Sequence, residues 1–305
     1  MDRLTEIDVL ILGAVPQEVG ALTELLETCR MLPQRGQTSW LGTFSNLSIL
    51  IATTGIGKVN AAITTASLLE WFSAAQVWHI GCAGAYPEGR LRIGDVLITE
   101  KALCGDEGIM TRGGVLPVSA IGIPIIVQNG EQIFDEVPLN WTGNMKSIFE
   151  KTPQGLYRQR KGPLPASASP CDKRDQRASG PSPASAGAAF ERELPFLPSA
   201  RQGATDEDLF HLVYGPSLTV GMVSGDPEVA GERFQHYGAY AENMEGSAVA
   251  HACRLFGTAM VECRGISNLA GNRAKETWQL EKSIAHCHGI IINWLEALNS
   301  VKLQQ

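Results

Sequence analysis

Residues 7–13 read Ile-Asp-Val-Leu-Ile-Leu-Gly, a short apolar run that ends at a glycine. Such a run, rich in Val, Leu and Ile, is typical of a strand that is buried on both faces. Residues 16–29 follow with apolar side chains at helical spacing and with a proline at the expected helix start. The chain therefore begins with a buried strand that leads into a helix.

The same alternation continues along the chain. Further strands are expected at 38–44, 47–53, 77–80, 95–99, 218–223 and 258–264, and further helices at 59–72, 245–256 and 276–298. Residues 81–84, Gly-Cys-Ala-Gly, are expected to form a turn at the end of a strand. This alternation predicts an α/β fold, a three-layer α/β/α domain in which helices flank a central twisted mixed sheet. In such folds the functional site lies where strands end.

The composition changes sharply between residues 153 and 202, where Pro, Ser, Ala, Gly and Arg predominate. A segment of this kind buries too little apolar surface to offset the entropy lost on ordering it. Strand and helix patterns resume after it. We therefore interpret 153–202 as a largely disordered insertion within a single domain that spans residues 1–305; a linker between two domains is the alternative.

The bulk composition argues against several classes of protein. The formal net charge of −7 disfavours nucleic-acid binding, which needs a positive surface. No apolar run is long enough to span a membrane, and the N-terminal apolar stretch is too short for a signal peptide. The 7 cysteines are scattered without a CxxC pair, which favours reduced thiols. A cytoplasmic protein without nucleic-acid or membrane partners is expected.

Motifs for metals and dinucleotides are missing from the sequence. Residues 55–58, Gly-Ile-Gly-Lys, resemble the end of a phosphate loop, but Val59 replaces the required Ser or Thr. His286 and His288 flank Cys287 on a predicted helix, where i and i+2 positions face different directions and make a poor metal pair. We interpret these three residues as part of a solvated helix face and expect neither a metal nor a cofactor.

Four segments carry the functional signal. They read Gly-Ala-Val-Pro-Gln-Glu-Val at 13–19, Thr-Gly-Ile-Gly-Lys-Val-Asn-Ala at 54–61, Glu-Asn-Met-Glu-Gly at 242–246 and Arg-Gly-Ile-Ser-Asn at 264–268. In order and spacing they resemble the nucleoside phosphorylase and nucleosidase family, over roughly residues 7–150 and 209–298. The last two segments look most like the futalosine hydrolase subfamily. The resemblance implies a homo-oligomeric enzyme, a dimer or larger, that cleaves the N-glycosidic bond of a small-molecule nucleoside with water and needs no cofactor.

The chemistry of this cleavage explains the residue types in these segments. The sugar becomes oxocarbenium-like and the purine leaves as an anion, so the site needs a base for water, a clamp on the sugar hydroxyls and a donor at the purine. Glu18 matches the family's water-activating carboxylate; its alternative is a solvated first-turn glutamate. Glu245 matches the carboxylate that accepts hydrogen bonds from the ribose, or it merely starts a helix. Met244 packs on the sugar or in the core.

Asn268 bears on which purine is bound. Adenine-specific nucleosidases of the family carry an Asp at this position, where an ionised carboxylate would oppose the O6 acceptor of a 6-oxopurine. An Asn amide donates to O6 and accepts from a protonated N7. The sequence therefore favours hypoxanthine or guanine as the base, with Asn268 as a catalytic residue beside Glu18.

The other residues that we expect near the substrate are less specific. They are Gly55, Cys82, Ala83, Gly84, Glu228, Val229, Arg264 and Ser267. Cys82 is interpreted as a small filler rather than a nucleophile. Glu228 and Val229 stand where adenine-specific relatives carry a stacking aromatic, and Glu228 either accepts from N1–H of a 6-oxopurine or faces solvent. Arg264 is either a cation of the site or a partner for Glu245 and Glu18.

Three other functions compete with a 6-oxopurine hydrolase. A purine nucleoside phosphorylase must bind a phosphate anion, which Glu18 would repel. Arg30, Arg35 and Arg90 could still bind phosphate, so this function stays an alternative. A methylthioadenosine/adenosylhomocysteine nucleosidase is disfavoured by Asn268. A non-catalytic nucleoside-binding protein is disfavoured because both carboxylates and the amide are present together.

Overall fold

The opening strand lies where the sequence predicts it, whereas the helix predicted at 16–29 ends early, at Thr23. In the computed structural model, which describes residues 4–33, 37–112, 114–139, 141, 144–159, 190–192 and 209–303, β2 (Val9–Gly13) leads directly into α1 (Pro16–Thr23). The other helices are α2 (Lys58–Trp71), α3 (Asn144–Glu150), α4 (Pro227–Tyr237), α5 (Gly246–Phe256) and α6 (Leu280–Lys302), with short 3-10 turns at Val118–Ala120 and Lys275–Thr277.

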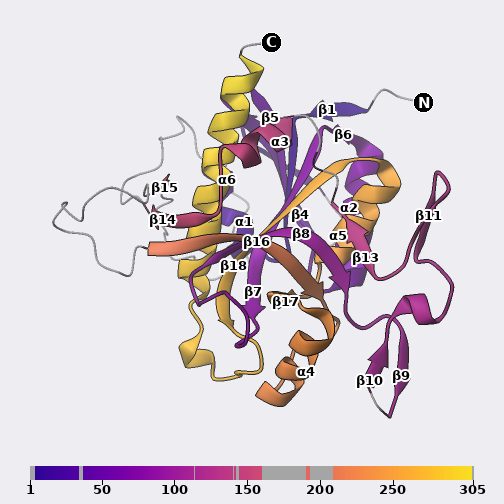
Figure 1. The fold of residues 1–305 in the computed structure, drawn as a ribbon. Coiled ribbons are helices and arrows are strands. Elements are labelled where there is room, and N and C mark those ends of the chain that lie inside the picture. Colours follow the sequence, from indigo (N-terminus) through magenta and orange to yellow (C-terminus); the bar gives the residue numbers. More distant parts are fainter. Residues whose placement is uncertain are drawn as a thin grey trace.

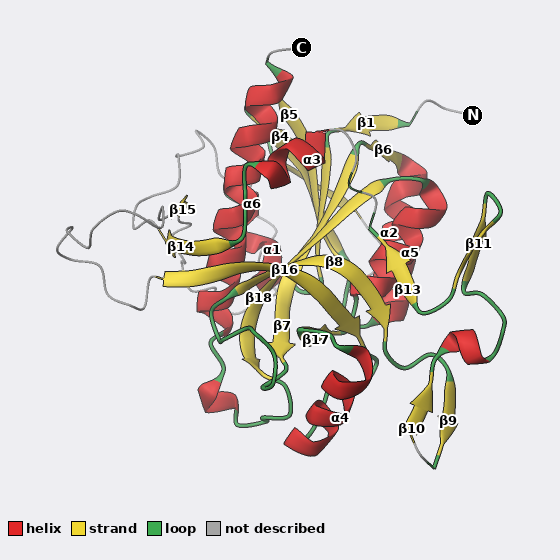
Figure 2. Ribbon diagram, in the orientation of Figure 1, coloured by secondary structure: helices red, strands yellow, loops and turns green. Residues whose placement is uncertain are grey.

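The strands divide between one large sheet and three small ribbons (Figures 1 and 2). The large sheet holds β3 (Arg30–Pro33), β4 (Thr38–Phe44), β5 (Leu47–Thr53), β2, β7 (Gln76–Ala85), β8 (Val96–Cys104), β13 (Glu136–Pro138), β14 (Gly155–Gln159), β15 (Phe190–Arg192), β16 (Leu209–Thr219), β17 (Ala241–Asn243) and β18 (Ala259–Leu269). The ribbons pair β1 (Thr5–Ile7) with β6 (Phe72–Ala74), β9 (Ile109–Thr111) with β10 (Gly114–Leu116), and β11 (Ile126–Gln128) with β12 (Glu131–Ile133).

The large sheet is mixed, with the order β15-β14-β16-β8-β18-β7-β2-β5-β4-β3. Its centre is parallel, because β2 pairs in parallel with both β5 and β7, and β18 pairs in parallel with β7. The hairpin β4–β5 and the pairing of β18 with β8 are antiparallel. A central parallel region buried on both faces is what the apolar run at residues 7–13 predicts.

The two faces of β2 belong to two different cores. Val9 and Ile11 pack with side chains of α1, α3 and α6. Leu10 and Leu12 pack with side chains of α2 and α5 on the opposite face. Figure 1 shows α6 on one side of the central strands and α2 and α5 on the other. Each such fully buried side chain contributes about 1.5–3 kcal/mol through the hydrophobic effect. The predicted three-layer α/β/α arrangement is confirmed.

Four strands of the large sheet differ from their predicted ranges. β8, expected at 95–99, continues to Cys104, and β16, expected at 218–223, instead covers Leu209–Thr219. β7 and β18 also run further than predicted. Residues 81–84 are not a turn, because β7 continues to Ala85 and pairs with both β18 and β17 in this region. Likewise β18 extends to Leu269 and includes Asn268. The small residues at 81–84 let neighbouring strands approach instead of ending the strand. Residues of two predicted loops therefore lie side by side on paired strands.

The predicted insertion at 153–202 lies mostly outside the described residues. Its two described pieces are strands: β14 pairs antiparallel with β16, and β15 pairs antiparallel with β14 at the edge of the sheet. The N-terminal bound of the insertion was therefore set too early, because β14 belongs to the sheet. In the described part of the chain, none of the helices combines the length and apolar character needed to cross a bilayer.

Candidate active site

The motif segments meet where the central strands end. Thr54 N–H donates to the Gly13 carbonyl at 2.8 Å, and Gly55 N–H donates to the Ala14 carbonyl at 2.9 Å. Two residues later, Gly57 N–H donates to Glu245 Oε1 at 2.9 Å. The loop at 54–57 thus joins the segment that carries Glu18 to the segment that carries Glu245.

Glu18 is held by main-chain donors from two elements. Its Oε2 accepts from Ala14 N–H at 2.7 Å and from Val15 N–H at 3.3 Å, both at the start of α1. Its Oε1 accepts from Cys82 N–H on β7 at 2.9 Å. The side chain is 7% exposed, so the alternative of a solvated first-turn glutamate is wrong. These bonds fix the carboxylate in one orientation.

Glu245 lies directly before α5 and is 5% exposed. Its N–H donates to Asn243 Oδ1 at 2.9 Å, and the same oxygen accepts from Gly246 N–H at 2.7 Å. Asn243 Nδ2 in turn donates to Ser217 Oγ at 2.8 Å. The Asn243 side chain therefore caps the start of α5 and sets the backbone from which the Glu245 carboxylate extends.

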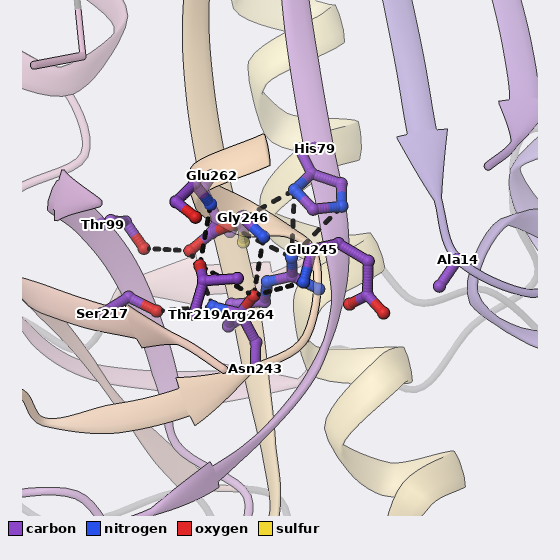
Figure 3. A network of polar contacts seen from close by, with 12 residues as sticks. Ala14, His79, Thr99, Ser217, Thr219, Asn243, Glu245, Gly246, Glu262 and Arg264 are labelled. Atoms are coloured by element: carbon purple, nitrogen blue, oxygen red, sulfur yellow. Dashed lines mark hydrogen bonds and ion pairs between the residues drawn. The ribbon is translucent and has the colours of Figure 1, made fainter. Parts of the chain in front are cut away.

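A buried charged cluster lies next to both carboxylates. Figure 3 shows this cluster together with Glu245. Arg264 Nη2 donates to Glu262 Oε2 at 3.1 Å and lies within 3.1 Å of both ring nitrogens of His79. Thr99 Oγ1 donates to Glu262 Oε1 at 2.7 Å. Arg264, Glu262 and His79 are each 0% exposed. Arg264 is thus hydrogen-bonded to Glu262. The alternative from the sequence, in which Arg264 pairs with Glu245 and Glu18, is not what the structure shows.

The charges in this cluster stabilise one another. Burial alone raises the pKa of Glu262, but the charge of Arg264 and the contacts with His79 and Thr99 outweigh burial and hold that pKa well below its usual range. Burial lowers the pKa of Arg264, but the charges of Glu262, Glu245 and Glu18 outweigh burial and raise that pKa above its usual value. Burial and the charge of Arg264 both lower the pKa of His79. At neutral pH the cluster therefore contains an ionised Glu262, a charged Arg264 and a neutral His79.

Glycines allow two close approaches in the cluster. A Cβ at Gly246 would overlap Glu262 Oε2, and a Cβ at Gly81 would overlap Glu18 Oε1 and lie 2.6 Å from Arg264 Nη1. Glu18 and Arg264 therefore come together over the Gly81 backbone. The Glu262 carboxylate packs directly against the residue that follows Glu245.

Gly246→Ala is expected to lower the free energy of unfolding by about 1–3 kcal/mol, because the new methyl group must displace a buried, fully bonded carboxylate. Chemical denaturation measures the change. Gly20→Ala on α1 is the matched control, since a Cβ there meets nothing within 4 Å and alanine favours a helix. Equal stability of Gly246→Ala and the wild type would show that Glu262 moves aside freely.

Asn268 lies near the end of β18, opposite Gly84 of β7. Its Oδ1 accepts from Ser267 Oγ at 2.8 Å, and its Nδ2 donates to the Leu269 carbonyl at 3.0 Å. These bonds fix the orientation of the amide and leave one N–H and one acceptor position on the side chain. Ser267 Oγ also lies 3.3 Å from the Ala83 carbonyl.

The Cys82 side chain is half-buried beside α6, with its Sγ 3.7 Å from Ser283 Oγ. Burial raises the pKa of the Cys82 thiol to about 12, and the nearby Glu18 carboxylate adds to the effect. A protonated thiol is a poor nucleophile. This agrees with the interpretation of Cys82 as a filler whose backbone N–H orients Glu18.

The remaining predicted residues are less enclosed. Met244 and Val229 are half-buried, and Glu228 is exposed in the first turn of α4. The solvent-facing alternative for Glu228 therefore fits this structure. Val229 N–H donates to the Asp226 side chain at 3.0 Å, which caps α4.

The helix residues His286, Cys287 and His288 are not solvated, so that prediction is wrong. They are 0%, 1% and 3% exposed. His288 Nε2 donates to the Glu18 carbonyl at 2.6 Å, and His286 Nδ1 donates to the Gly94 carbonyl at the same distance. The helix α6 is covered here by α1, β18 and the loop before β8, so its three successive side chains all meet protein.

Of the cysteines that the structure describes, one departs from the predicted reduced state, and Cys171 lies outside the described residues. Cys82, Cys104, Cys253, Cys263 and Cys287 are free, whereas Cys29 is disulfide-bonded. In the described residues no group of three or more His, Cys, Asp or Glu side chains is placed to hold a metal ion.

Sequence reasoning missed Glu262, His79 and Asn243. The available signal was the spacing of Glu262 and Arg264: two charged residues at i and i+2 of an otherwise apolar strand share one face. Buried charges need partners. A search for a buried counterion of Arg264 would have found Glu262.

Comparison with known proteins assigns the family. A model of the phosphorylase superfamily matches residues 8–135 and 147–291. The chain belongs to the phosphorylase superfamily. Among curated superfamily members, a 5'-methylthioadenosine/S-adenosylhomocysteine nucleosidase of Bacillus pumilus is 23% identical over 94% of this chain and 98% of its own length. A futalosine hydrolase of Thermus thermophilus is 25% identical over 76% of this chain and 74% of its own length.

Solved structures of the superfamily share the fold. The 5'-methylthioadenosine/S-adenosylhomocysteine nucleosidase of Colwellia psychrerythraea, in complex with adenine, superimposes with a TM-score of 0.66 at 20% identity and covers 97% of this chain and 98% of that one. Futalosine hydrolase of Helicobacter pylori gives a TM-score of 0.63 at 20% identity, over 96% and 98% of the two chains. The fold alone does not separate the two kinds of hydrolase.

Proposed function

We propose that this protein hydrolyses the N-glycosidic bond of a 6-oxopurine nucleoside. In this proposal Glu18 activates water, Glu245 binds the ribose hydroxyls and Asn268 binds the purine. The substrate that fits best is futalosine, which would yield dehypoxanthine futalosine and hypoxanthine, a step of menaquinone biosynthesis. Futalosine rests on the likeness of the segments at 242–246 and 264–268 to the futalosine hydrolase subfamily and on the Thermus relative.

One observation carries the proposal: two buried carboxylates, from Glu18 and Glu245, are joined through the loop at 54–57 and share the electrostatic environment of Arg264. An oriented, desolvated carboxylate is suited to take a proton from water. A second one stabilises the positive charge that the sugar gains as the bond breaks. The two buried carboxylates would thus supply both the base for water and the negative charge beside the sugar.

Water is favoured over phosphate as the nucleophile. A phosphate anion beside Glu18 would be repelled by its carboxylate. Of the arginines that left phosphorolysis open, Arg30 and Arg90 are exposed and Arg35 lies outside the described residues. The buried Arg264 is already paired with Glu262.

Cleavage of an adenine nucleoside is the second candidate, because the 5'-methylthioadenosine/S-adenosylhomocysteine nucleosidase of Bacillus pumilus matches a larger share of this chain than the Thermus hydrolase does. Asn268 argues against it. With its orientation fixed by Ser267 and Leu269, the amide has one N–H left to donate to O6 and one position left to accept from N7–H. A 6-amino group would place its own N–H against the N–H of the Asn268 amide, so two donors would oppose each other.

The test is chromatography of products from futalosine, inosine and methylthioadenosine, each with and without phosphate. We expect hypoxanthine release from futalosine at a rate that phosphate does not change, and a sugar product with a free anomeric hydroxyl. A ribose 1-phosphate product would contradict hydrolysis. Preferential cleavage of methylthioadenosine would replace the 6-oxopurine proposal with the second candidate.

A further inference from the structure

Only one of the three guanidinium nitrogens of Arg264 makes hydrogen bonds within the described residues. Nη2 contacts Glu262 and His79, whereas Nε and Nη1 are buried and have no hydrogen-bond partner among the described residues. Nη1 is directed toward Glu18, since both approach the position that a Cβ of Gly81 would occupy. A buried donor without an acceptor is unfavourable. The free edge of the guanidinium therefore faces the proposed base without bonding it.

Glu262 is more firmly held than any other acid near Arg264. One oxygen accepts from Thr99 Oγ1 at 2.7 Å and from Asn243 Nδ2 at 3.4 Å. The other accepts from Arg264 Nη2 at 3.1 Å and lies 3.3 Å from His79 Nδ1. These contacts come from β8, β17, β18 and β7. Glu262 is thus a fixed counterion built into the sheet.

We propose that Glu262 is a positioning residue that holds Arg264 in an ion pair and so prevents Arg264 from closing onto Glu18. The Glu18 oxygens then stay available to receive a proton from the attacking water. The inference rests on the proposed function, in which Glu18 is the base.

Several acidic side chains compete for the charge of Arg264. Three carboxylates act on the charge of Arg264: Glu262, Glu245 and Glu18. Main-chain N–H groups bond Glu245 Oε1 and both oxygens of Glu18, so neither acid is free of partners. Glu18 is nevertheless the acid that the unpaired edge of the guanidinium faces over Gly81, and it would receive that edge if the charge of Glu262 were removed. A carboxylate bound by arginine is a weaker base, because the cation stabilises its ionised form.

The groups that face Glu18 come from three elements. Arg264 approaches from β18, the Cys82 thiol lies on β7, and His288 of α6 contacts the Glu18 main chain. The Cys82 thiol stays protonated because burial raises its pKa to about 12. Burial lowers the pKa of His288, so that its ring is neutral at neutral pH. Arg264 therefore faces Glu18 as a charged group, whereas the Cys82 thiol and the His288 ring are neutral.

The test compares Glu262→Gln with Glu262→Asp, which keeps the charge. We expect Glu262→Gln to lower kcat by about 10-fold or more with little change in KM, and to move the acidic limb of the pH–rate profile to lower pH. Glu262→Asp should keep the limb near its wild-type position. Thr99→Val, which removes one bond that holds Glu262, should move the limb in the same direction by less. The Thr99→Val profile decides the matter if Glu262→Gln does not fold.

A double-mutant cycle with Arg264→Gln separates positioning from simple packing. If Glu262 acts through Arg264, then Glu262→Gln has no further effect on the acidic limb once the cation is gone. An equal shift in both backgrounds would overturn the inference. An unchanged limb in Glu262→Gln and in Thr99→Val would overturn it as well.

A crystal structure of Glu262→Gln gives a result that does not depend on turnover. We expect Arg264 Nη1 within hydrogen-bonding distance of a Glu18 oxygen. If the wild type cleaves none of the three nucleosides but this pair forms, the proposed function fails and the inference about the ion pair stands. If the wild type is active and Arg264 keeps its place in the variant, the inference fails and the proposed function stands.

Discussion

Glu18→Gln is expected to lower kcat by about 100-fold or more while nucleoside binding survives. The amide keeps the shape of the side chain but accepts no proton from water. Single-turnover rates together with calorimetric titration of the nucleoside separate chemistry from binding. Near-normal turnover would show that Glu18 only stabilises the start of α1.

The Glu18 substitution has a structural side effect that needs a control. Both oxygens of the wild-type carboxylate accept main-chain N–H bonds, from Ala14 and Val15 on one side and Cys82 on the other. Gln must turn its NH2 toward one of these donors, which costs about 1–3 kcal/mol of stability. Melting curves identify this loss. Glu27→Gln, at an exposed residue just after α1, is the matched control for the charge.

Asn268→Asp is expected to change the preference for 6-oxopurine over 6-aminopurine nucleosides by tens to hundreds of fold, roughly the effect of one mispaired polar contact in a closed site. The carboxylate would face O6 of a 6-oxopurine but would accept from a 6-amino group. The quantity to measure is the ratio of the two kcat/KM values, because the absolute gain on adenine nucleosides is limited by the rest of the pocket.

Asn272→Asp, three residues after the end of β18, provides the control for Asn268→Asp near the end of that strand. Asn272 is exposed, and its Oδ1 accepts from Ala274 N–H at 2.9 Å, a bond that an aspartate keeps. We expect no change in the preference ratio for this variant. An unaltered ratio in Asn268→Asp would remove Asn268 from purine recognition and leave the 6-oxopurine proposal to family likeness alone.

Local sequence patterns predicted the helices α1, α2, α5 and α6 and the central strands because those elements depend on local signals, but they missed α3, α4 and the short peripheral strands. The hairpin strands at 38–44 and 47–53 and the helix at 246–256 agree with their predicted positions to within a residue. The strands at 76–85 and 259–269 were predicted too short. Their extensions, 81–85 and 265–269, are rich in small and polar residues. They are strands because they pair with each other, which is a tertiary contact that periodicity does not encode.

The residues of the candidate site likewise divide into those that the local sequence predicts and those that it does not. Glu18, Glu245, Arg264 and Asn268 lie in segments with a recognisable local order, so they were found. Glu262 gains its role from the strands beside it, and His288 gains its burial from three elements packed around α6. The i, i+2 spacing of Glu262 and Arg264 indicates that these two charges share a face. The contacts of Glu262 with Thr99 and Asn243 and the burial of His288 depend instead on elements distant in the sequence, which local patterns do not show.

The bond between His288 and the Glu18 carbonyl joins residues 270 positions apart in the chain. During synthesis, the helix that carries Glu18 emerges well before α6, so this buried contact forms only after the long segment between them has been made. Contacts of such separation are slow to form, because a long loop must close before any stabilisation results. Assembly of this site is therefore a late event in folding, and a nascent chain truncated before α6 should accumulate without a completed catalytic centre.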